Sequence, residues 1–142
     1  MAKTFMLRLL TPDRRVFEDK VEGVIVPGEQ GDLGMLAGHA RLVSTLIPGM
    51  LRYVQNDQSF SCAISGGFVE VFRDGVTVLA ESLERPEEID VERATNARAE
   101  ATKNLADAIK TTDEANIAHC QERLARAETR LKVAKLAGQK SA

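Results

Sequence analysis

The chain has 142 residues, of which 44% are hydrophobic and 28% charged, and its formal net charge is −2. This length suits one ordinary domain or two small ones, and the composition is that of a soluble globular protein. No apolar run approaches the roughly 20 residues that span a bilayer, and Arg8 interrupts the short apolar run near the N-terminus. We therefore expect a cytoplasmic protein, or one bound peripherally at the cytoplasmic face of a membrane.

Charge is distributed unevenly along the second half of the chain. Residues 86–114 hold 4 basic and 8 acidic side chains, whereas residues 115–142 hold 6 basic and 2 acidic ones. This pattern favours two antiparallel helices of opposite charge, or a basic second helix that seeks an acidic partner. Nucleic-acid binding would require a larger basic excess and aromatic residues for stacking, so we do not expect it.

The first 85 residues have the pattern of an antiparallel β-sheet. Apolar residues alternate with polar ones in short runs, and paired turn formers recur about every ten residues, which is typical of an all-β sandwich or barrel. Asp74-Gly75 is the strongest hairpin signal. The expected strands are 4–10, 16–18, 21–26, 42–46, 50–54, 59–64, 68–72 and 76–80, with turns at Pro48-Gly49, Asn56-Asp57 and Gly66-Gly67.

The glycine-rich segment 28–40 does not match a phosphate-binding loop. It lacks both the Gly-Lys-Ser/Thr ending of a P-loop and the G-x-G-x-x-G spacing of a dinucleotide site. We expect its glycines to serve backbone positions with positive φ or close sheet contact. His39 has no second histidine or cysteine nearby, and we expect it to be satisfied within its turn, with Asp32 solvated.

No catalytic or metal site is expected. Nothing in the chain assembles a nucleophile, a base and an orienting group. Cys62 and Cys120 lie in different halves, which suits neither a disulfide framework nor a metal cluster, so we expect two reduced thiols.

The pattern changes to that of a helical hairpin after Arg85. Pro86 ends the strand region, and Asp90 can cap a first helix. Thr111 and Glu114 match a capping box for a second helix, with Gly138 as its stop. The expected apolar stripes are Ala94, Ala97, Ala101, Leu105 and Ala108 on the first helix, and Ile117, Cys120, Leu124, Ala127, Leu131 and Ala134 on the second.

The sequence therefore predicts an α+β protein with a β-sandwich domain in residues 1–85 and a helical hairpin in residues 86–142. Because the stripes are rich in alanine, packing stabilises the hairpin weakly, at roughly 25 cal/mol per Å² of apolar area. We expect that such a hairpin can open into an extended form. On the second helix, Arg123, Arg126 and Arg130 form either a solvated basic face or a site for an anion or acidic partner.

From end to end, the chain resembles the epsilon subunit of bacterial F-type ATP synthases, the counterpart of the mitochondrial delta subunit. The resemblance rests on T-P-D-R-R-V-F-E (11–18), V-P-G-E-Q-G-D-L-G-M-L-A-G-H-A (26–40), P-G-M-L-R-Y (48–53), S-G-G-F-V-E-V (65–71), V-T-V-L-A-E (76–81) and I-D-V-E-R-A (89–94). It implies a β-sandwich of about ten strands and a C-terminal helical hairpin. It also implies a non-catalytic rotor subunit of the central stalk, bound to the gamma subunit, the c-ring and the catalytic alpha/beta subunits, at the cytoplasmic face of the bacterial inner membrane.

In this family the subunit helps to couple proton flow to ATP synthesis, and its extended helices can block ATP hydrolysis. No cofactor is required, although some members bind regulatory ATP. The resemblance places such a nucleotide on Glu84, Ile89, Asp90, Arg93, Ala94, Arg126 and Arg130. It assigns Asp32 and His39 to the c-ring, and Arg123, Arg126 and Arg130 to an acidic segment of the catalytic beta subunit.

One position departs from the family pattern. The strongest ATP binders have an arginine where this chain has Glu100, and a carboxylate there would repel phosphate. We therefore expect ATP binding that is weak or absent. The alternative function is a free-standing nucleotide-sensing module, which would not co-purify with other subunits.

Overall fold

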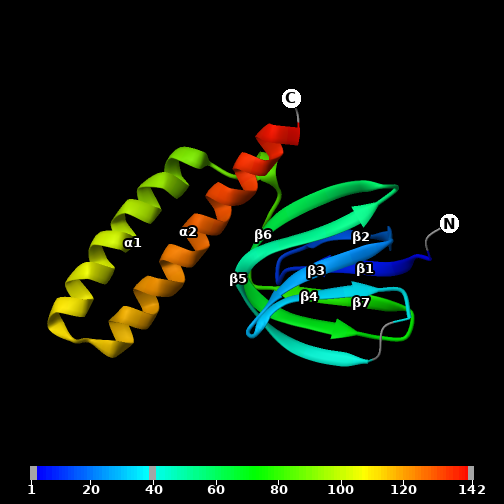
Figure 1. Ribbon diagram of the computed structural model, residues 1–142, viewed down its shortest axis with the longest axis horizontal. Coiled ribbons are helices and arrows are strands. Elements are labelled where there is room, and N and C mark those ends of the chain that lie inside the picture. Colours follow the sequence, from blue (N-terminus) through cyan, green and yellow to red (C-terminus); the bar gives the residue numbers. More distant parts are fainter. Residues whose placement is uncertain (1–2, 39–40, 141–142) are drawn as a thin grey trace.

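The computed structural model describes residues 3–38 and 41–140, which form a β-sandwich and a helical hairpin beside it (Figure 1). Its strands are β1 (Phe5–Leu10), β2 (Arg15–Val21), β3 (Gly23–Gly28), β4 (Gly31–Leu36), β5 (Leu42–Gln55), β6 (Gln58–Val71), β7 (Gly75–Ala80) and β8 (Leu83–Glu84). A 3-10 helix, η1 (Pro86–Glu88), then leads to α1 (Val91–Thr111) and α2 (Glu114–Lys140). The α+β fold class is confirmed, with eight strands in the described residues where about ten were expected.

All the strands belong to one continuous sheet with the order β2-β1-β7-β6-β5-β3-β4, and β8 pairs with β6. The pairing is antiparallel except between β1 and β7, which are parallel. The two long strands, β5 and β6, run through both layers of the sandwich. The two strands pair with each other along their whole length. The half of β6 around Val71 also pairs with β7, and the half of β5 around Arg52 also pairs with β3.

The turns expected at Pro48-Gly49 and Gly66-Gly67 are wrong, because both pairs lie inside β5 and β6 where these strands bend between the layers. Gly66 and Gly67 have φ of 118° and 142°. A Cβ on Gly67 would stand 2.0 Å from the carbonyl oxygen of Leu79, so only glycine allows β7 to approach here. The bend therefore continues a strand instead of reversing it.

Two other turns were located correctly, and one strand was missed. Asn56 and Asp57 both have positive φ and connect β5 to β6, and the Asp74-Gly75 turn connects β6 to β7. The glycine-rich segment contributes β4, which pairs with β3 across a tight turn at Gly31, where φ is 121°. His39 lies outside the described residues.

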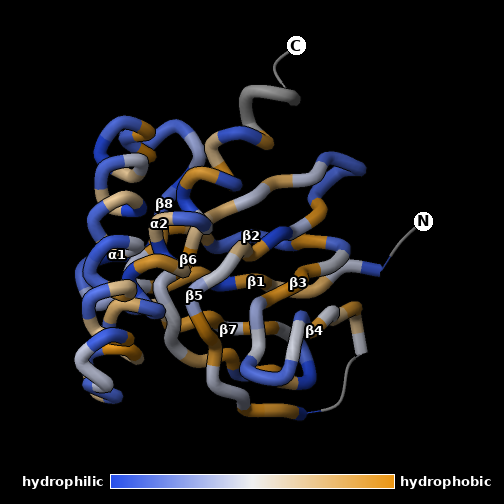
Figure 2. The backbone as a smooth tube through the Cα atoms, turned by 60° about the vertical axis from the view of Figure 1, so that its left-hand side comes forward, coloured by the Kyte–Doolittle hydropathy of each residue, from blue (hydrophilic) through white to orange (hydrophobic). Residues whose placement is uncertain are grey.

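The main core fills the space between the two layers. Leu7, Leu51, Val69 and Val78 have no exposed surface, and Figure 2 shows the hydrophobic residues concentrated along these strands. The core cluster consists of residues from the strands alone, so the sandwich has its own hydrophobic core without the helices.

Cys62 is a buried free thiol in this core. Burial raises its pKa from 9.0 to about 11, because desolvation disfavours the thiolate. Above pH ~9 the unfolded chain then binds fewer protons than the folded chain, so Cys62 makes stability fall as pH rises through about 9 to 11. We expect Cys62→Ala to flatten this alkaline decline. Urea midpoints of both proteins at pH ~8 and pH ~10.5 measure how strongly the stability of each depends on pH. The small cavity left by Cys62→Ala costs the same at both pH values, so it does not affect the comparison.

The helices form an antiparallel hairpin in which α2 lies between α1 and the sandwich (Figures 1 and 2). Ala94, Ala101 and Ala108 are the buried residues of α1, and Cys120 and Ala127 are buried on α2. These small residues recur every seven positions, which lets the two helices lie close together. The alanine-rich contact expected between them is confirmed.

Two expected helix signals are wrong. Asp113 caps α2, because its carboxylate accepts from the N–H of Asn116 (3.2 Å), while the Thr111 hydroxyl donates back to α1 carbonyls. Thr112 ends α1 in the left-handed conformation, so Thr111 still belongs to the preceding helix. Gly138 does not stop α2, which continues to Lys140.

Candidate functional site

The connection from sandwich to hairpin forms one wall of the candidate site. Glu84 ends β8, the short strand held by Ala63 and Ile64 on β6. Asp90 starts α1 as the sequence predicts, because its carboxylate accepts from the N–H of Arg93 (3.0 Å). The residues between them, in η1, therefore bring the first turn of α1 to the edge of the sandwich.

A small apolar cluster holds α2 against the sandwich. Val133 has no exposed surface and packs with Ala63 on β6 and Ile89 in the connection. Met50 and Ala134 cover the cluster. The stripe read from the sequence did not include Val133, although it did include its neighbour Ala134. The hairpin thus docks through few apolar residues.

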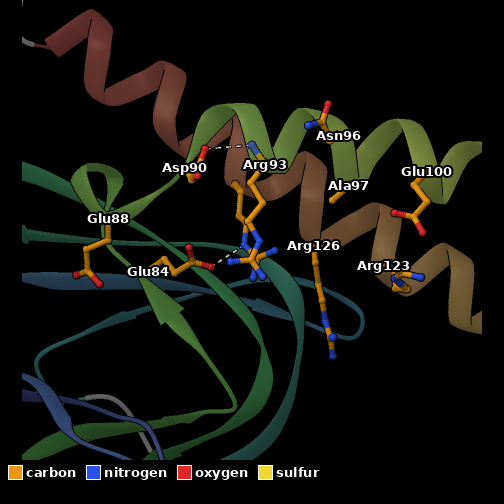
Figure 3. Close-up of a pocket in the computed structure, with 11 residues that line it drawn as sticks. Glu84, Glu88, Asp90, Arg93, Asn96, Ala97, Glu100, Arg123 and Arg126 are labelled. Atoms are coloured by element: carbon orange, nitrogen blue, oxygen red, sulfur yellow. Dashed lines mark hydrogen bonds and ion pairs between the residues drawn. The ribbon is translucent and has the colours of Figure 1, made fainter.

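A cavity of about 610 Å³ lies beside this cluster, between the start of α1, the middle of α2 and the connection (Figure 3). This volume is in the range of small-molecule sites. It is lined mainly by charged residues: Glu84, Glu88, Asp90, Arg93, Ala94, Asn96, Ala97, Glu100, Arg123, Arg126 and Arg130.

Two arginines of α2 are already bound to carboxylates of the sandwich edge. Arg130 Nε donates to Glu84 Oε1 (2.5 Å), and both side chains are about one-third exposed or less. Arg126 Nη2 donates to Glu122 (2.5 Å) and lies 3.4 Å from Glu81. Arg126 Nε is buried and has no hydrogen-bond partner among the described residues, so one donor of this guanidinium is unused.

The other two arginines have no ion pair within residues 3–38 and 41–140, the part of the chain described. Arg93 points from α1 into the space beside Glu84 (Figure 3). Arg123 lies on α2 near Glu100, at the other end of the cavity. The lining contains four arginines and four carboxylates, so a polyanion would meet guanidinium groups and competing negative charge together.

The structure brings together most of the residues predicted for a nucleotide site. Glu84, Asp90, Arg93, Ala94, Arg126 and Arg130 all line the cavity. Ile89 does not line it and is instead buried against Ala63 and Val133. Glu88, Asn96 and Ala97 also line the cavity and were not predicted for it. Asn96 and Ala97 follow from the helical period once Arg93 is placed in the site.

The residues predicted for partners fall in two places. Arg123, Arg126 and Arg130 are partly buried along α2, where they line the cavity and two of them pair with carboxylates. Asp32 is exposed on β4 beside the β3–β4 turn, and His39 lies outside the described residues.

Metal-binding clusters and membrane-spanning helices are both absent from the described part of the chain. Within it, no group of three or more His, Cys, Asp or Glu side chains could hold a metal ion. No helix there has both the length and the apolar character that crossing a membrane requires.

Family comparisons identify both halves of the chain. The family "ATP synthase, Delta/Epsilon chain, beta-sandwich domain" matches residues 4–86, and "ATP synthase, Delta/Epsilon chain, long alpha-helix domain" matches residues 87–135. The ATP synthase epsilon chain of Herpetosiphon aurantiacus is 42% identical over 130 residues, which are 92% of this chain and 93% of that one. The epsilon chain of Shouchella clausii is 40% identical over 135 residues, covering 95% and 98%.

A solved structure agrees with this match. A chain of the Euglena gracilis mitochondrial ATP synthase (OSCP, F1 and c-ring) superposes with a TM-score of 0.77 at 28% identity, covering 92% of this chain and 81% of that one. The fold, the order of the two domains and the similarity over nearly the full length of the chain all point to the same family. The chain belongs to the delta/epsilon chain family of the ATP synthases, as its sequence motifs predict.

Proposed function

We propose that this chain is the non-catalytic epsilon-type subunit of the central stalk of a bacterial F-type ATP synthase. In this role the sandwich binds the gamma subunit and the c-ring, and the whole chain turns with the rotor while proton flow drives ATP synthesis. The similarity to a chain of the Euglena ATP synthase, determined with its F1 part and c-ring, supports this assignment. The subunit would be peripheral to the membrane, at its cytoplasmic face, through the complex.

We also propose that the helices restrain ATP hydrolysis by leaving the sandwich. The observation that carries this proposal is the position of Arg126 and Arg130, which Glu81 and Glu84 hold against the sandwich. These guanidiniums can reach an acidic segment of the catalytic beta subunit only after the pairs separate. The folded hairpin would therefore be the non-inhibitory form, and the extended hairpin the inhibitory one.

Truncation tests the regulatory proposal. A chain that ends at Glu88 keeps every residue of the main core, so we expect it to fold and to assemble with the other subunits. ATP hydrolysis by the truncated complex should rise above that of the complete complex, since the helices are gone. Equal hydrolysis rates, measured at the same subunit stoichiometry, would contradict the inhibitory role. Failure to co-purify with gamma and catalytic subunits would instead favour a free-standing nucleotide-sensing module.

The cavity beside α1 is proposed as a weak ATP site. Arg93, which lines the cavity without an ion pair among the described residues, supplies donors for phosphate oxygens. Against this, Arg130 is bound to Glu84, and Glu100 adds negative charge. Binding would stabilise the folded hairpin, because the lining residues come from both helices and the connection.

Glu100→Arg should strengthen ATP binding, because it replaces a repelling carboxylate in the lining with a donor for phosphate. We expect an affinity gain of about 10-fold or more, measured by calorimetric titration of the isolated protein. Glu92→Arg makes the same charge change on α1 outside the cavity lining and is the matched control. A micromolar constant for the unmodified chain would overturn the weak-binding proposal, and equal effects of both variants would overturn the role of position 100.

A further inference from the structure

Two arginines attach the connection that leads to the hairpin to the β1–β2 corner. One belongs to the connection and donates to β2, and the other belongs to the β1–β2 turn and donates to the connection. Arg85, in the connection, donates from Nη2 to the carbonyl oxygen of Val16 on β2 (3.0 Å). Arg14, in the β1–β2 turn, donates from Nη2 to the Glu88 carboxylate (2.9 Å). These contacts join segments that are 69 and 74 residues apart in the sequence.

The acceptor on β2 is available because of an irregularity in the sheet. Leu9 pairs with Phe17 and Leu10 pairs with Arg15, so Val16 is an extra residue without a partner on β1. A β-bulge of this kind leaves the extra residue outside the ladder of hydrogen bonds. The Val16 carbonyl is therefore free to accept from Arg85.

Both arginines are held in place by their surroundings. The turn that carries Arg14 is closed by the N–H of Thr11, which donates to the Arg14 carbonyl oxygen (3.0 Å). Arg85 is half-buried, and its guanidinium also interacts with the Tyr53 hydroxyl on β5. The contact between Arg14 and Glu88 is an exposed ion pair. The contact between Arg85 and Val16 places a charged donor in a partly buried site.

None of these contacts involves the hairpin. α2 is held by the Val133 cluster and by the ion pairs of Arg126 and Arg130, and α1 packs mainly on α2. The backbone is extended at Ile89 and Asp90, with φ and ψ of −81° and 123° and of −84° and 100°. Those two residues are the first point at which the chain can swing away without breaking a contact to the β1–β2 corner.

We propose that Arg14, Val16, Arg85 and Glu88 form a clasp that keeps η1 on the sandwich when the hairpin detaches, with Ile89–Asp90 as the pivot. The role in release rests on the proposed regulatory function. The clasp itself is a property of the isolated chain, so it can be tested without ATP or other subunits.

Native-state hydrogen exchange of the full chain, followed by NMR in low urea, tests the clasp. The probes are the N–H groups of Glu88, bonded to Arg85 O (3.0 Å), and Ile89, bonded to Pro86 O (3.3 Å). We expect both to open with the amides of β5 and β6, and α2 amides to open earlier. Opening of both probes together with α2 in the unmodified chain would overturn the proposal.

The variants give the second readout. Arg85→Gln should speed exchange at Glu88 by about 10-fold or more, because a charged hydrogen bond is lost. Arg14→Gln should speed it about two- to five-fold, and adding Glu88→Gln should have no further effect. Arg15→Gln is the control, since Arg15 pairs with Glu18 on its own strand.

The two proposals fail in different ways. If α2 amides open only with the whole sandwich, the release step of the proposed function is contradicted, yet Arg85→Gln must still accelerate Glu88. If Arg85→Gln matches Arg15→Gln, the clasp is overturned whatever the hairpin does.

Discussion

Val133→Asp is expected to detach the hairpin and leave the sandwich folded. Val133 has no exposed surface and contacts Ala63 and Ile89, so an aspartate there would lie among apolar groups without a partner. Such a change costs about 3 kcal/mol or more, which exceeds what a small docking cluster can supply. The main core does not include this cluster, so the sandwich should unfold at nearly the same urea concentration. Small-angle X-ray scattering should show a larger radius of gyration.

A matched substitution separates the loss of docking from the general effect of an aspartate in α2. Gln121→Asp adds the same charge at an exposed position of α2, and its scattering profile should equal that of the unmodified chain. A compact Val133→Asp protein would mean that the ion pairs of Arg126 and Arg130 hold the hairpin without the apolar cluster. In the assembled synthase, the detached hairpin should lower ATP hydrolysis if extended helices inhibit it.

Ala101→Leu is expected to separate α1 from α2 while α2 stays on the sandwich. Ala101 is 1% exposed and belongs, with Ala94 and Ala108, to the buried row of α1, the helix that packs on α2. Extra methyl groups in a contact this close cost about 1–3 kcal/mol. Leucine and alanine have similar helix propensities, so the loss comes from packing and not from the helix itself.

Hydrogen exchange along α1 measures this effect. Amides of α1 should exchange faster in Ala101→Leu, whereas those of α2 near Val133 should change little. Ala106→Leu places the same side chain at an exposed position of α1 and should leave exchange unchanged. Equal exchange in both variants would show that the small residues are not needed for helix pairing.

The parts of the fold that depend on local chemistry could be predicted from the sequence. Asp90 was found because a cap acts within three residues, and Asp74-Gly75 because a short hairpin is a local structure. The bends at Pro48-Gly49 and Gly66-Gly67 look like turns in the sequence. Only the register with β7, which makes Gly67 necessary beside Leu79, shows that the strand continues.

The contacts of α2 show a second feature of the fold that could not be predicted from the sequence. A single periodic stripe describes a helix with one partner, but α2 packs on α1 with Cys120 and Ala127 and on the sandwich with Val133. The arginines predicted for the site, Arg93, Arg126 and Arg130, lie together in the lining of one cavity. That Glu84 already occupies Arg130 could not be predicted, because the two residues lie 46 positions apart and meet only through docking.

The two thiols of this chain stand on opposite sides of the boundary between its domains. Cys62 is buried in the sandwich core and Cys120 between the helices, each 3% exposed. A thiol reagent can reach Cys120 only when the helices part and Cys62 only when the sandwich opens, so their labelling rates time two different motions. The labelling rate of Cys120 therefore reports how fast the helices separate, and that of Cys62 how fast the sandwich opens. Mass spectrometry of the two labelled peptides can follow both rates in the unmodified protein, inside an assembled, turning complex.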